Sequence, residues 1–490
     1  MNGSLIFTYQ PEAGATAGGV GRFDWGSTRK CVDVGLWHSS DRGQNFRELG
    51  WQVDKPVPWY ARREGDYLAT TTAIAIDPSN PSAMWLTNGM EVLQTDNWKT
   101  APGSADKLTG ATKWRSVMLG LEELVCNACA APPQPGGADL ILLGMDGMGL
   151  RQQSRDEVPQ KGLREAIGLP DLGLTSGQDI AYCASDPSVV AVTAYSEEGI
   201  SGMCTNGIST DNGRSFSRFC GNSTLDRPGV PAYATSGAVA LGGNNCEVLL
   251  WAPAHVSPPK GTEWCLLVSH TRGESFSCAS GLPTDVPFQQ AGPWSPARNL
   301  VASSIDPETF FFVHNWKGVF RSNTGGLNWT QVSKQNWPLP TGWMLFLTLL
   351  HEAGSLWLGA RRDDPSHAPQ PLWRSQDDGA TWGAVQSTAV VNFFAFGKAS
   401  PNASVPTLFM HGKTLGSEPE AVHRSDNLGQ TWQRIADPMT NGFGLISGMC
   451  ADMRDEVVYV VLHGRGVFYG MPGKSTDLEP QAQRLNGTAT

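Results

Sequence analysis

Hydrophobic residues along this chain form short runs that glycine, proline and small polar residues interrupt. The longest run covers residues 343–350 and contains a threonine. It is shorter than the roughly 18 to 20 apolar residues that a membrane-spanning helix needs. Short apolar runs between frequent turn residues are typical of short strands joined by tight loops. The pattern therefore predicts an all-β chain with no membrane partner.

One eight-residue pattern recurs and indicates the architecture. Its template is S-x-[D/N/T]-x-G-x-[T/S/N]-[W/F], known as the Asp box. It occurs at residues 39–46, 209–216, 269–276, 322–329, 375–382 and 425–432, with a degenerate copy at 94–98. The short polar side chain can cap backbone N–H groups, the glycine can adopt positive φ, and the aromatic residue leads into the next strand. Each copy therefore predicts a hairpin turn between two strands.

The spacing of the boxes predicts a β-propeller. From the second box onward, successive template glycines lie 60, 53, 53 and 50 residues apart, which is the length of one four-stranded blade. The 170 residues between the first and second template glycines leave room for about three more blades whose boxes have decayed. At this spacing the chain holds about nine blades, too many for one ring and too few for two rings of seven.

These counts predict a chain that is truncated or unevenly split between two rings. We assign residues 1–230 to the remaining blades of the first propeller and residues 231–470 to the second. Residues 471–490 are expected to form a disordered tail. A chain that has lost its leading blades would expose unpaired strand edges and would aggregate or recruit a partner.

Ten cysteines favour an oxidising compartment. Cys204 and Cys220 bracket the second box, and Cys265 and Cys278 bracket the third, so we predict a disulfide in each pair. Cys126 and Cys129 form a C-x-x-C motif without a second ligand pair, which favours a disulfide role over half of a zinc site.

Glycosylation acceptor patterns agree with secretion. They begin at Asn222, Asn328, Asn402 and Asn486, although such triplets often arise by chance. The N-terminus lacks the basic and apolar regions of a signal peptide. The expected location is extracellular.

The charge balance makes nucleic acid an unexpected partner. There are 36 Lys and Arg residues against 46 Asp and Glu, a net charge of −10, and basic residues form no stripe. Common catalytic and metal-ligand motifs are missing, so no metal or cofactor is expected. Carboxylates and aromatic rings remain, and these are the residue types that a polysaccharide hydrolase uses.

Several stretches together resemble glycoside hydrolase family 74. They are residues 75–81, 120–123, 142–149, 175–182, 396–401 and 458–470, and the last is the most specific. The resemblance implies two seven-bladed propellers with a cleft between them, and therefore a tandem seven-bladed fold whose first propeller is incomplete in this chain. It further implies inverting hydrolysis of β-1,4-glucan chains such as xyloglucan, with a polysaccharide as the partner.

The family's catalytic aspartates have no clear counterparts here. The first belongs to a T-D-[VI]-G-G stretch near the chain start, which this sequence lacks. We expected the second shortly before the segment Trp-Ala-Pro at 251–253, where Gly242 stands. Asp146 is the best remaining catalytic candidate, because its Met-Asp-Gly-Met-Gly setting resembles the family's G-D-[IV]-G-G segment. Asp179 is the next, although a structural role fits both residues.

Candidate substrate-binding residues are aromatic rings and two glutamates. Trp251, Trp316, Trp337 and Trp343 could stack on sugar faces, although packing is the commoner role of such rings. Glu122 and Glu123 could organise the cleft loops. If the catalytic pair is lost, the alternatives are an inactive carbohydrate-binding propeller or a sortilin-like propeller module.

Overall fold

The computed structural model of the chain is built almost entirely from strands. It describes residues 5–9, 35–39, 41–45, 47–49, 51–54, 73–87, 92–98, 112–117, 125–137, 139–144, 149–155, 162–166, 175–196, 205–220, 228–231, 234–255, 263–284, 288, 298–314, 317–333, 344–349, 354–361, 370–416, 419–436, 445–464 and 466–471. Among these residues the only helix is α2 (Leu163–Ala166). None of them belongs to a helix long and apolar enough to span a bilayer.

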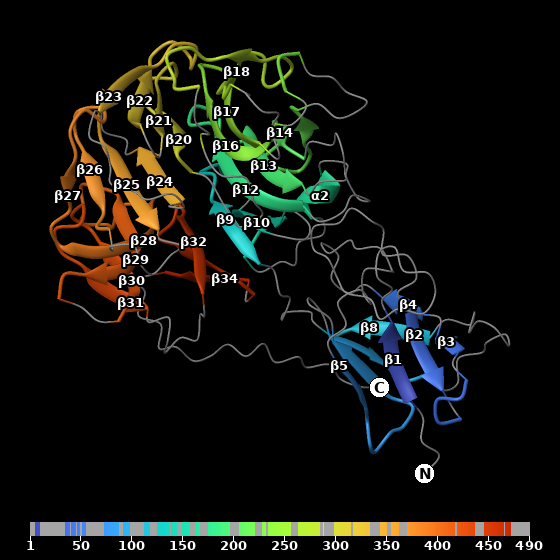
Figure 1. Cartoon of the computed structure of the whole chain (residues 1–490). Helices are drawn as coiled ribbons and strands as arrows, with labels where there is room; N and C mark the ends of the chain where they lie inside the picture. The colour runs from blue at the N-terminus through green and yellow to red at the C-terminus, as the bar shows by residue number, and fades with distance from the viewer. Residues whose placement is uncertain are drawn as a thin grey trace.

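Seven antiparallel sheets follow one another along the chain and form a closed ring (Figure 1). Sheets 2 to 6 have four strands, and sheets 1 and 7 have three. The first strand of each sheet is innermost. At six of the seven junctions it lies beside the first strand of the next sheet, and between sheets 5 and 6 the main contact joins the second strand of sheet 5 to the first strand of sheet 6. The chain is therefore an all-β propeller, as the Asp boxes predicted.

The strands of the ring have the following bounds. Sheet 1 contains β9 (Cys126–Ala130), β10 (Leu140–Gly144) and β11 (Gly149–Gln152). Sheet 2 contains β12 (Thr175–Tyr182), β13 (Val190–Ser196), β14 (Gly207–Ser209) and β15 (Ser217–Arg218). Sheet 3 contains β16 (Ala234–Gly242), β17 (Val248–His255), β18 (Leu267–Ser269) and β19 (Ser277–Cys278). Sheet 4 contains β20 (Leu300–Ala302), β21 (Phe310–His314), β22 (Gly318–Ser322) and β23 (Thr330–Ser333). Sheet 5 contains β24 (Met344–Leu349), β25 (Leu356–Arg361), β26 (Trp373–Ser375) and β27 (Gly383–Ala384). Sheet 6 contains β28 (Thr388–Gly397), β29 (Thr407–Thr414), β30 (Ala421–Ser425) and β31 (Gln433–Ala436). Sheet 7 contains β32 (Ile446–Ala451), β33 (Val458–Leu462) and β34 (Val467–Gly470).

Because the strands alternate in direction, the ring has two distinct ends. We call the end at which each first strand begins the top end, and the opposite one the bottom end. The connections from second to third strands lie at the top end. The connections from third to fourth strands, which include the Asp boxes, lie at the bottom end.

The ring closes where sheet 7 meets sheet 1. A disulfide joins Cys129 on β9 to Cys450 on β32, with a Cα–Cα distance of 5.8 Å. At the opposite end of β9, Val125 and His463 form an antiparallel bridge. These links connect chain segments more than 300 residues apart, so sheet 1 is fixed to sheet 7 covalently as well as by packing.

Charged side chains strengthen the same junction toward the bottom end. Arg454 donates to the carbonyl oxygen of Gln134 at 2.7 Å, and its Nη2 lies 3.6 Å from Asp139 Oδ1. Arg155 of sheet 1 donates to Asp455 of sheet 7 at 3.2 Å. Each contact crosses the seam between the two sheets.

The Asp boxes fold as the template predicts. In the box at 209–216, Ser209 Oγ accepts from Gly213 N at 2.8 Å, and Asp211 Oδ1 accepts from Ser215 N at 2.9 Å. The serine-to-glycine bond recurs in all six boxes at 2.8 to 3.1 Å. Both Asn212 and Gly213 have positive φ, 62° and 76°, the geometry of a tight hairpin turn. Positive φ was predicted for the glycine and is confirmed. It was not predicted for the preceding residue, Asn212, which also has positive φ.

The core lies between adjacent sheets, where side chains of first and second strands interleave. Trp251 and Trp357 are completely buried there. Close packing also explains a glycine: a Cβ on Gly242, at the end of β16, would lie 2.4 Å from a ring carbon of Phe310 and 2.9 Å from the carbonyl oxygen of Pro307.

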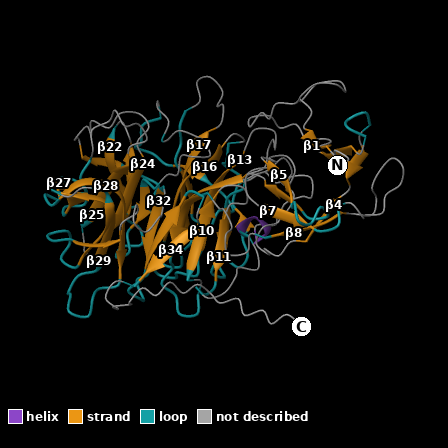
Figure 2. Ribbon diagram, turned by 90° about the horizontal axis from the view of Figure 1, so that it is seen from below, coloured by secondary structure: helices purple, strands orange, loops and turns teal. Residues whose placement is uncertain are grey.

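Two further sheets precede the ring (Figures 1 and 2). One contains β1 (Leu5–Tyr9), β2 (Gly35–Ser39) and β3 (Arg47–Leu49). The other contains β5 (Ala73–Ile76), β6 (Met84–Thr87), β7 (Val92–Thr95) and β8 (Thr112–Ser116), with β4 (Trp51–Asp54) added parallel to β8. The degenerate box at 94–98 connects β7 and β8, where Asn97 N donates to Thr95 Oγ1 at 3.3 Å. It therefore occupies the place of an Asp box.

The domain division predicted at residues 230 and 231 falls inside the ring, between β15 and β16. Sheet 1 carries no Asp box, and in its described residues β11 is followed by an isolated bridge between Leu150 and Gly162 and then by α2. The spacing of boxes therefore gave no sign that the ring begins near residue 125. The predicted tail, residues 471–490, lies outside the described residues except for Met471.

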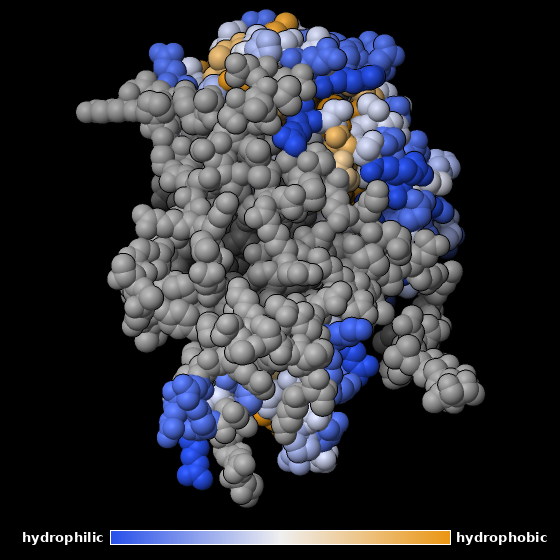
Figure 3. Space-filling model, turned by 90° about the vertical axis from the view of Figure 1, so that its right-hand side faces the viewer, coloured by the Kyte–Doolittle hydropathy of each residue, from blue (hydrophilic) through white to orange (hydrophobic). Residues whose placement is uncertain are grey.

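On the face drawn in Figure 3, the described residues are mostly hydrophilic at the surface, with small groups of hydrophobic ones between them. Exposed large hydrophobic residues are scattered over separate elements, for example Ile305, Leu415 and Tyr469. Scattered exposure of this kind is ordinary for a folded chain.

Disulfides join both strands and sheets. Cys265 and Cys278 bond across β18 and β19, which confirms that prediction. Cys220 is disulfide-bonded, and its predicted partner, Cys204, lies outside the described residues. Cys129 bonds to Cys450, so the expected disulfide role holds for it but Cys126 is not its partner.

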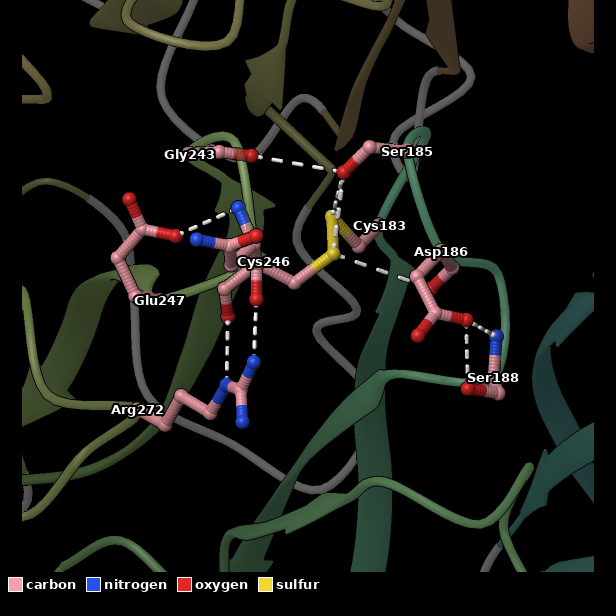
Figure 4. The surroundings of a disulfide bond; sticks show 9 residues. Cys183, Ser185, Asp186, Ser188, Gly243, Cys246, Glu247 and Arg272 are labelled. Atoms are coloured by element: carbon pink, nitrogen blue, oxygen red, sulfur yellow. Dashed lines mark hydrogen bonds between the residues drawn. A yellow bond between two sulfur atoms is a disulfide. The ribbon is translucent and has the colours of Figure 1, made fainter.

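The fourth bond, Cys183–Cys246, ties the bottom of sheet 2 to the bottom of sheet 3 (Figure 4). Around it, Ser185 Oγ lies 3.3 Å from each of the two sulfurs, and the Arg272 guanidinium donates to the carbonyl oxygen of Cys246 at 3.2 Å. This bond links turns of adjacent blades, so its two cysteines come together only when the sheets have packed side by side. The sequence around either cysteine therefore did not indicate the pairing.

Candidate functional site

Polar residues interrupt the first strands of five sheets near the top end. The pairing of first and second strands slips at these positions, as expected of β-bulges. The residues left out of register are Asn127 on β9, Gln178 on β12, Ser236 and Gly237 on β16, Ala389 and Asn392 on β28, and Ser447 on β32. Bulges redirect side chains and free backbone groups, so this end of the ring is lined with hydrogen-bonding groups.

Several of these groups bond to the next sheet. Ser447 Oγ donates to the carbonyl oxygen of Cys126 at 2.6 Å. Asn127 Nδ2 donates to Ser176 Oγ and to the carbonyl oxygen of Gly177, both at 2.9 Å. Bonds from β32 to β9 and from β9 to β12 therefore hold the bulges in place.

Asp179 continues this set of bonds from β12 to β16. Its Oδ2 accepts from Val239 N at 2.9 Å, and its Oδ1 accepts from Ile180 N at 2.9 Å and lies 3.8 Å from Arg298 Nε. Burial raises the pKa of this carboxyl to about 7, against the opposing effects of Arg298 and the two backbone donors. The residue is only 3% exposed. This geometry favours a structural carboxylate, and a catalytic role for Asp179 stays a prediction.

Arg298 reaches across the interior of the ring. It precedes β20 in sheet 4, yet its Nη2 donates to the carbonyl oxygen of Cys129 in sheet 1 at 3.0 Å, and its Nε faces Asp179 in sheet 2. Burial lowers the pKa of the guanidinium, and the Asp179 charge opposes that effect. Sequence reasoning missed Arg298 because no motif surrounds it and its partners come from distant blades.

Trp251 is not available to stack on a sugar. Its ring is completely buried and lies edge-on to Phe219 and Phe276, at centroid distances of 5.6 and 6.2 Å. Its Nε1 donates to the carbonyl oxygen of Ser236. The ring therefore belongs to the core, and its expected role as a sugar platform is corrected to packing.

Gly242 is not the site of a lost catalytic aspartate. It ends β16 at the bottom end of the ring, and Phe310 and Pro307 fill the space that a side chain would need. The glycine is explained by this close approach between sheets 3 and 4.

The other candidates lie outside the described residues: Asp146, Glu122, Glu123, Trp316, Trp337 and Trp343. The strand ends that flank them are described, and all belong to the top end of the ring. Gly144 and Gly149 flank Asp146, β9 follows the two glutamates, and β21 and β22 flank Trp316. The connections that contain these candidates therefore belong to the top end of the ring, where the bulges lie.

Two predicted glycosylation acceptors are described and exposed. Asn328 lies in the fourth ring sheet's Asp box, where its Oδ1 accepts from Ser280 Oγ at 2.7 Å, and Asn402 lies in the turn between β28 and β29. Asn222 and Asn486 lie outside the described residues. Within the described part of the chain, no group of three or more His, Cys, Asp and Glu could hold a metal ion.

Comparison with known proteins defines the class as a propeller related to xyloglucan-cleaving glycosidases. A probable oligoxyloglucan-reducing end-specific xyloglucanase from Neosartorya fischeri is 27% identical over 421 residues, covering 82% of this chain and 47% of that protein. The oligoxyloglucan-reducing end-specific xyloglucanase of Emericella nidulans is 24% identical over 457 residues, covering 87% and 52%. No family model matches the chain.

The structural comparison agrees. The crystal structure of the family 74 xyloglucanase from Xanthomonas campestris superimposes with a TM-score of 0.67 at 23% identity, covering 91% of this chain and 56% of that one. These findings confirm the resemblance to glycoside hydrolase family 74. The chain spans about half the length of the curated relatives it matches.

Proposed function

We propose that the chain acts on xyloglucan or a related β-1,4-glucan as an inverting glycoside hydrolase. The observation that carries this proposal is similarity to proteins named xyloglucanases along more than four-fifths of the chain, on the same propeller fold. The polar top end of the ring supports it, because sugar hydroxyls need many donors and acceptors.

Inverting hydrolysis needs two carboxyl groups. One protonates the leaving oxygen, and the other activates a water on the opposite face of the sugar, about 6.5 to 9.5 Å away. The proposal gives one of these roles to Asp146. The support for this role is the resemblance of its Met-Asp-Gly-Met-Gly setting to the family's G-D-[IV]-G-G segment. Gly149, which follows the connection, has a φ of 123°, and a Cβ there would meet the carbonyl oxygen of Leu142 at 1.8 Å. Glycine is therefore the residue that fits at the start of β11, directly after this connection.

The proposed location is extracellular. The Cys129–Cys450, Cys183–Cys246 and Cys265–Cys278 bonds suit an oxidising compartment, where a plant polysaccharide would also be met. The exposed acceptors Asn328 and Asn402 are compatible with glycosylation there.

The test is release of reducing ends from xyloglucan by the purified chain, compared with Asp146→Asn and a matched control, Asp186→Asn. Asp186 is an exposed aspartate at the bottom end. We expect hydrolysis by the wild type and the control, and a rate at least about 100-fold lower for Asp146→Asn, the scale of lost acid or base catalysis. If the folded wild-type protein bound xyloglucan without hydrolysing it, the chain would be a carbohydrate-binding propeller and not an enzyme.

A further inference from the structure

A second carboxylate occupies the same topological position in sheet 6 that Asp146 occupies in sheet 1. Glu420 ends the connection between β29 and β30, and Asp146 lies in the connection between β10 and β11. Both connections join second and third strands at the top end of the ring. Unlike Asp146, Glu420 is among the described residues, so its surroundings are known.

The Glu420 carboxylate is held by a hydrogen bond from one neighbouring strand and lies beside a histidine of another. Asn392, in the bulge of β28, donates from Nδ2 to Glu420 Oε2 at 2.7 Å. His411 on β29 places Nε2 3.9 Å from the same oxygen. One face of the carboxylate is therefore committed to the protein, which fixes its orientation.

The groups that orient Glu420 are themselves fixed by packing. His411 is 8% exposed and its ring stacks on Phe393, with centroids 6.4 Å apart and planes 18° from parallel. Beside it, a Cβ on Gly412 would lie 1.9 Å from the carbonyl oxygen of Val390, so only glycine allows β29 to approach the bulged β28 this closely. The bulge is thus locked where it directs the Asn392 side chain to Glu420.

The second carboxylate oxygen is available to a ligand. The Glu420 side chain is 35% exposed, and no donor among the described residues contacts Oε1. A fixed carboxylate oxygen at a partly exposed site accepts well from hydroxyl groups, and a hydrogen bond to a charged group is stronger than a neutral one. Neutral glycans present pairs of adjacent hydroxyls that match a carboxylate next to an amide.

We propose that Glu420, Asn392 and His411 form a contact site for the hydroxyl groups of a neutral β-glucan chain at the top end of sheet 6. Glu420 Oε1 accepts from a sugar hydroxyl, while Asn392 holds the carboxylate and His411 packs beside it. The site binds and positions the chain and takes no part in bond cleavage. It rests on the proposed function, because it extends the substrate surface from the Asp146 side of the ring to sheet 6.

The experiment measures binding of xyloglucan oligosaccharides by calorimetry, using the whole chain. Glu420→Ala is compared with Glu274→Ala, which removes the same charge from an exposed position in an Asp box at the bottom end. We expect the Kd to rise about 10- to 100-fold for Glu420→Ala, the range for loss of a hydrogen bond to a charged group. Glu274→Ala should leave it unchanged. Asn392→Ala should weaken binding less, because it frees the carboxylate without removing it.

Kinetics separate this role from catalysis. With xyloglucan as substrate, Glu420→Ala should raise KM and leave kcat within about twofold, as expected for a group that binds ground state and transition state alike. Equal affinities of wild type and Glu420→Ala, with matching thermal melts, would overturn the site while wild-type hydrolysis still supported the proposed function. A wild type that neither binds nor cleaves xyloglucan would overturn both.

Discussion

Removal of the Cys129–Cys450 disulfide should destabilise the ring more than removal of any other described disulfide. This bond joins the first and last sheets of the ring across 321 residues. The Cys265–Cys278 bond joins two strands of one sheet across 13 residues. The paired substitutions Cys129→Ala with Cys450→Ala, and Cys265→Ala with Cys278→Ala, compare the two directly.

The expected magnitudes follow from loop closure in the unfolded chain. A bond that closes a loop of this larger size reduces the entropy of the unfolded state by an amount equivalent to about 6 kcal/mol, against about 3 kcal/mol for the smaller loop. Measured effects are often below these values because the unfolded chain retains structure. We therefore predict a loss of about 3 to 6 kcal/mol for the ring-closing pair and about 1 to 3 kcal/mol for the local pair.

The assay is guanidinium unfolding of both double variants and the wild type under non-reducing conditions. A reduced wild-type sample should approach the less stable variant. Equal midpoints for the two variants, or a smaller shift for the ring-closing pair, would show that the Val125–His463 bridge and the Arg454 and Arg155 contacts are sufficient to hold the seam. The reasoning about ring closure would then be wrong.

Three further predictions concern individual side chains. Asp179→Ala should cost about 3 to 5 kcal/mol in urea unfolding, because it removes a buried carboxylate that faces the Arg298 guanidinium and accepts from Val239 N; a loss below 1 kcal/mol would contradict this structural role. Asp211→Ala should cost about 1 to 2 kcal/mol and Asp211→Asn clearly less, because Asn427 makes the equivalent bonds in the sixth box; equal losses would refute this. Hydrogen bonds from Asn45 lower the pKa of Asp41 to about 2 from 3.8, so its contribution to stability is present above pH 4 and is lost as the pH falls toward 2. Melts between pH 5 and pH 2 should therefore show a steeper decline for the wild type than for Asp41→Asn.

The propeller could be predicted from the sequence because the Asp box is a local structure. Its serine, aspartate and glycine bond within eight residues, so the pattern, the turn and the blade spacing are all visible in the chain. The start of the ring could not be predicted, because sheet 1 has no box and, in the part of the chain that the structure describes, continues from β11 into an isolated bridge and α2. Its place in the ring is set by Cys450 and His463, more than 300 residues away.

The candidate site was less accessible to sequence reasoning. Trp251 was a candidate sugar platform with packing as the commoner alternative, and its ring is buried against Phe219 and Phe276. The sequence could not decide between the two roles, because the same aromatic residue suits a cleft and a contact between blades. No sequence motif marks Arg298 or Glu420, because the residues that they contact belong to other strands or other sheets. Asp146 was selected by resemblance to a family segment, and its role stays a prediction.

The most direct test of the account is the stereochemistry of xyloglucan hydrolysis, followed by NMR as the first products form. The account predicts that the purified chain releases oligosaccharides whose new reducing ends are initially in the α configuration, inverted from the β-linkage, and that Asp146→Asn releases almost none. Products that first appear in the β configuration, or full activity in Asp146→Asn, would contradict it.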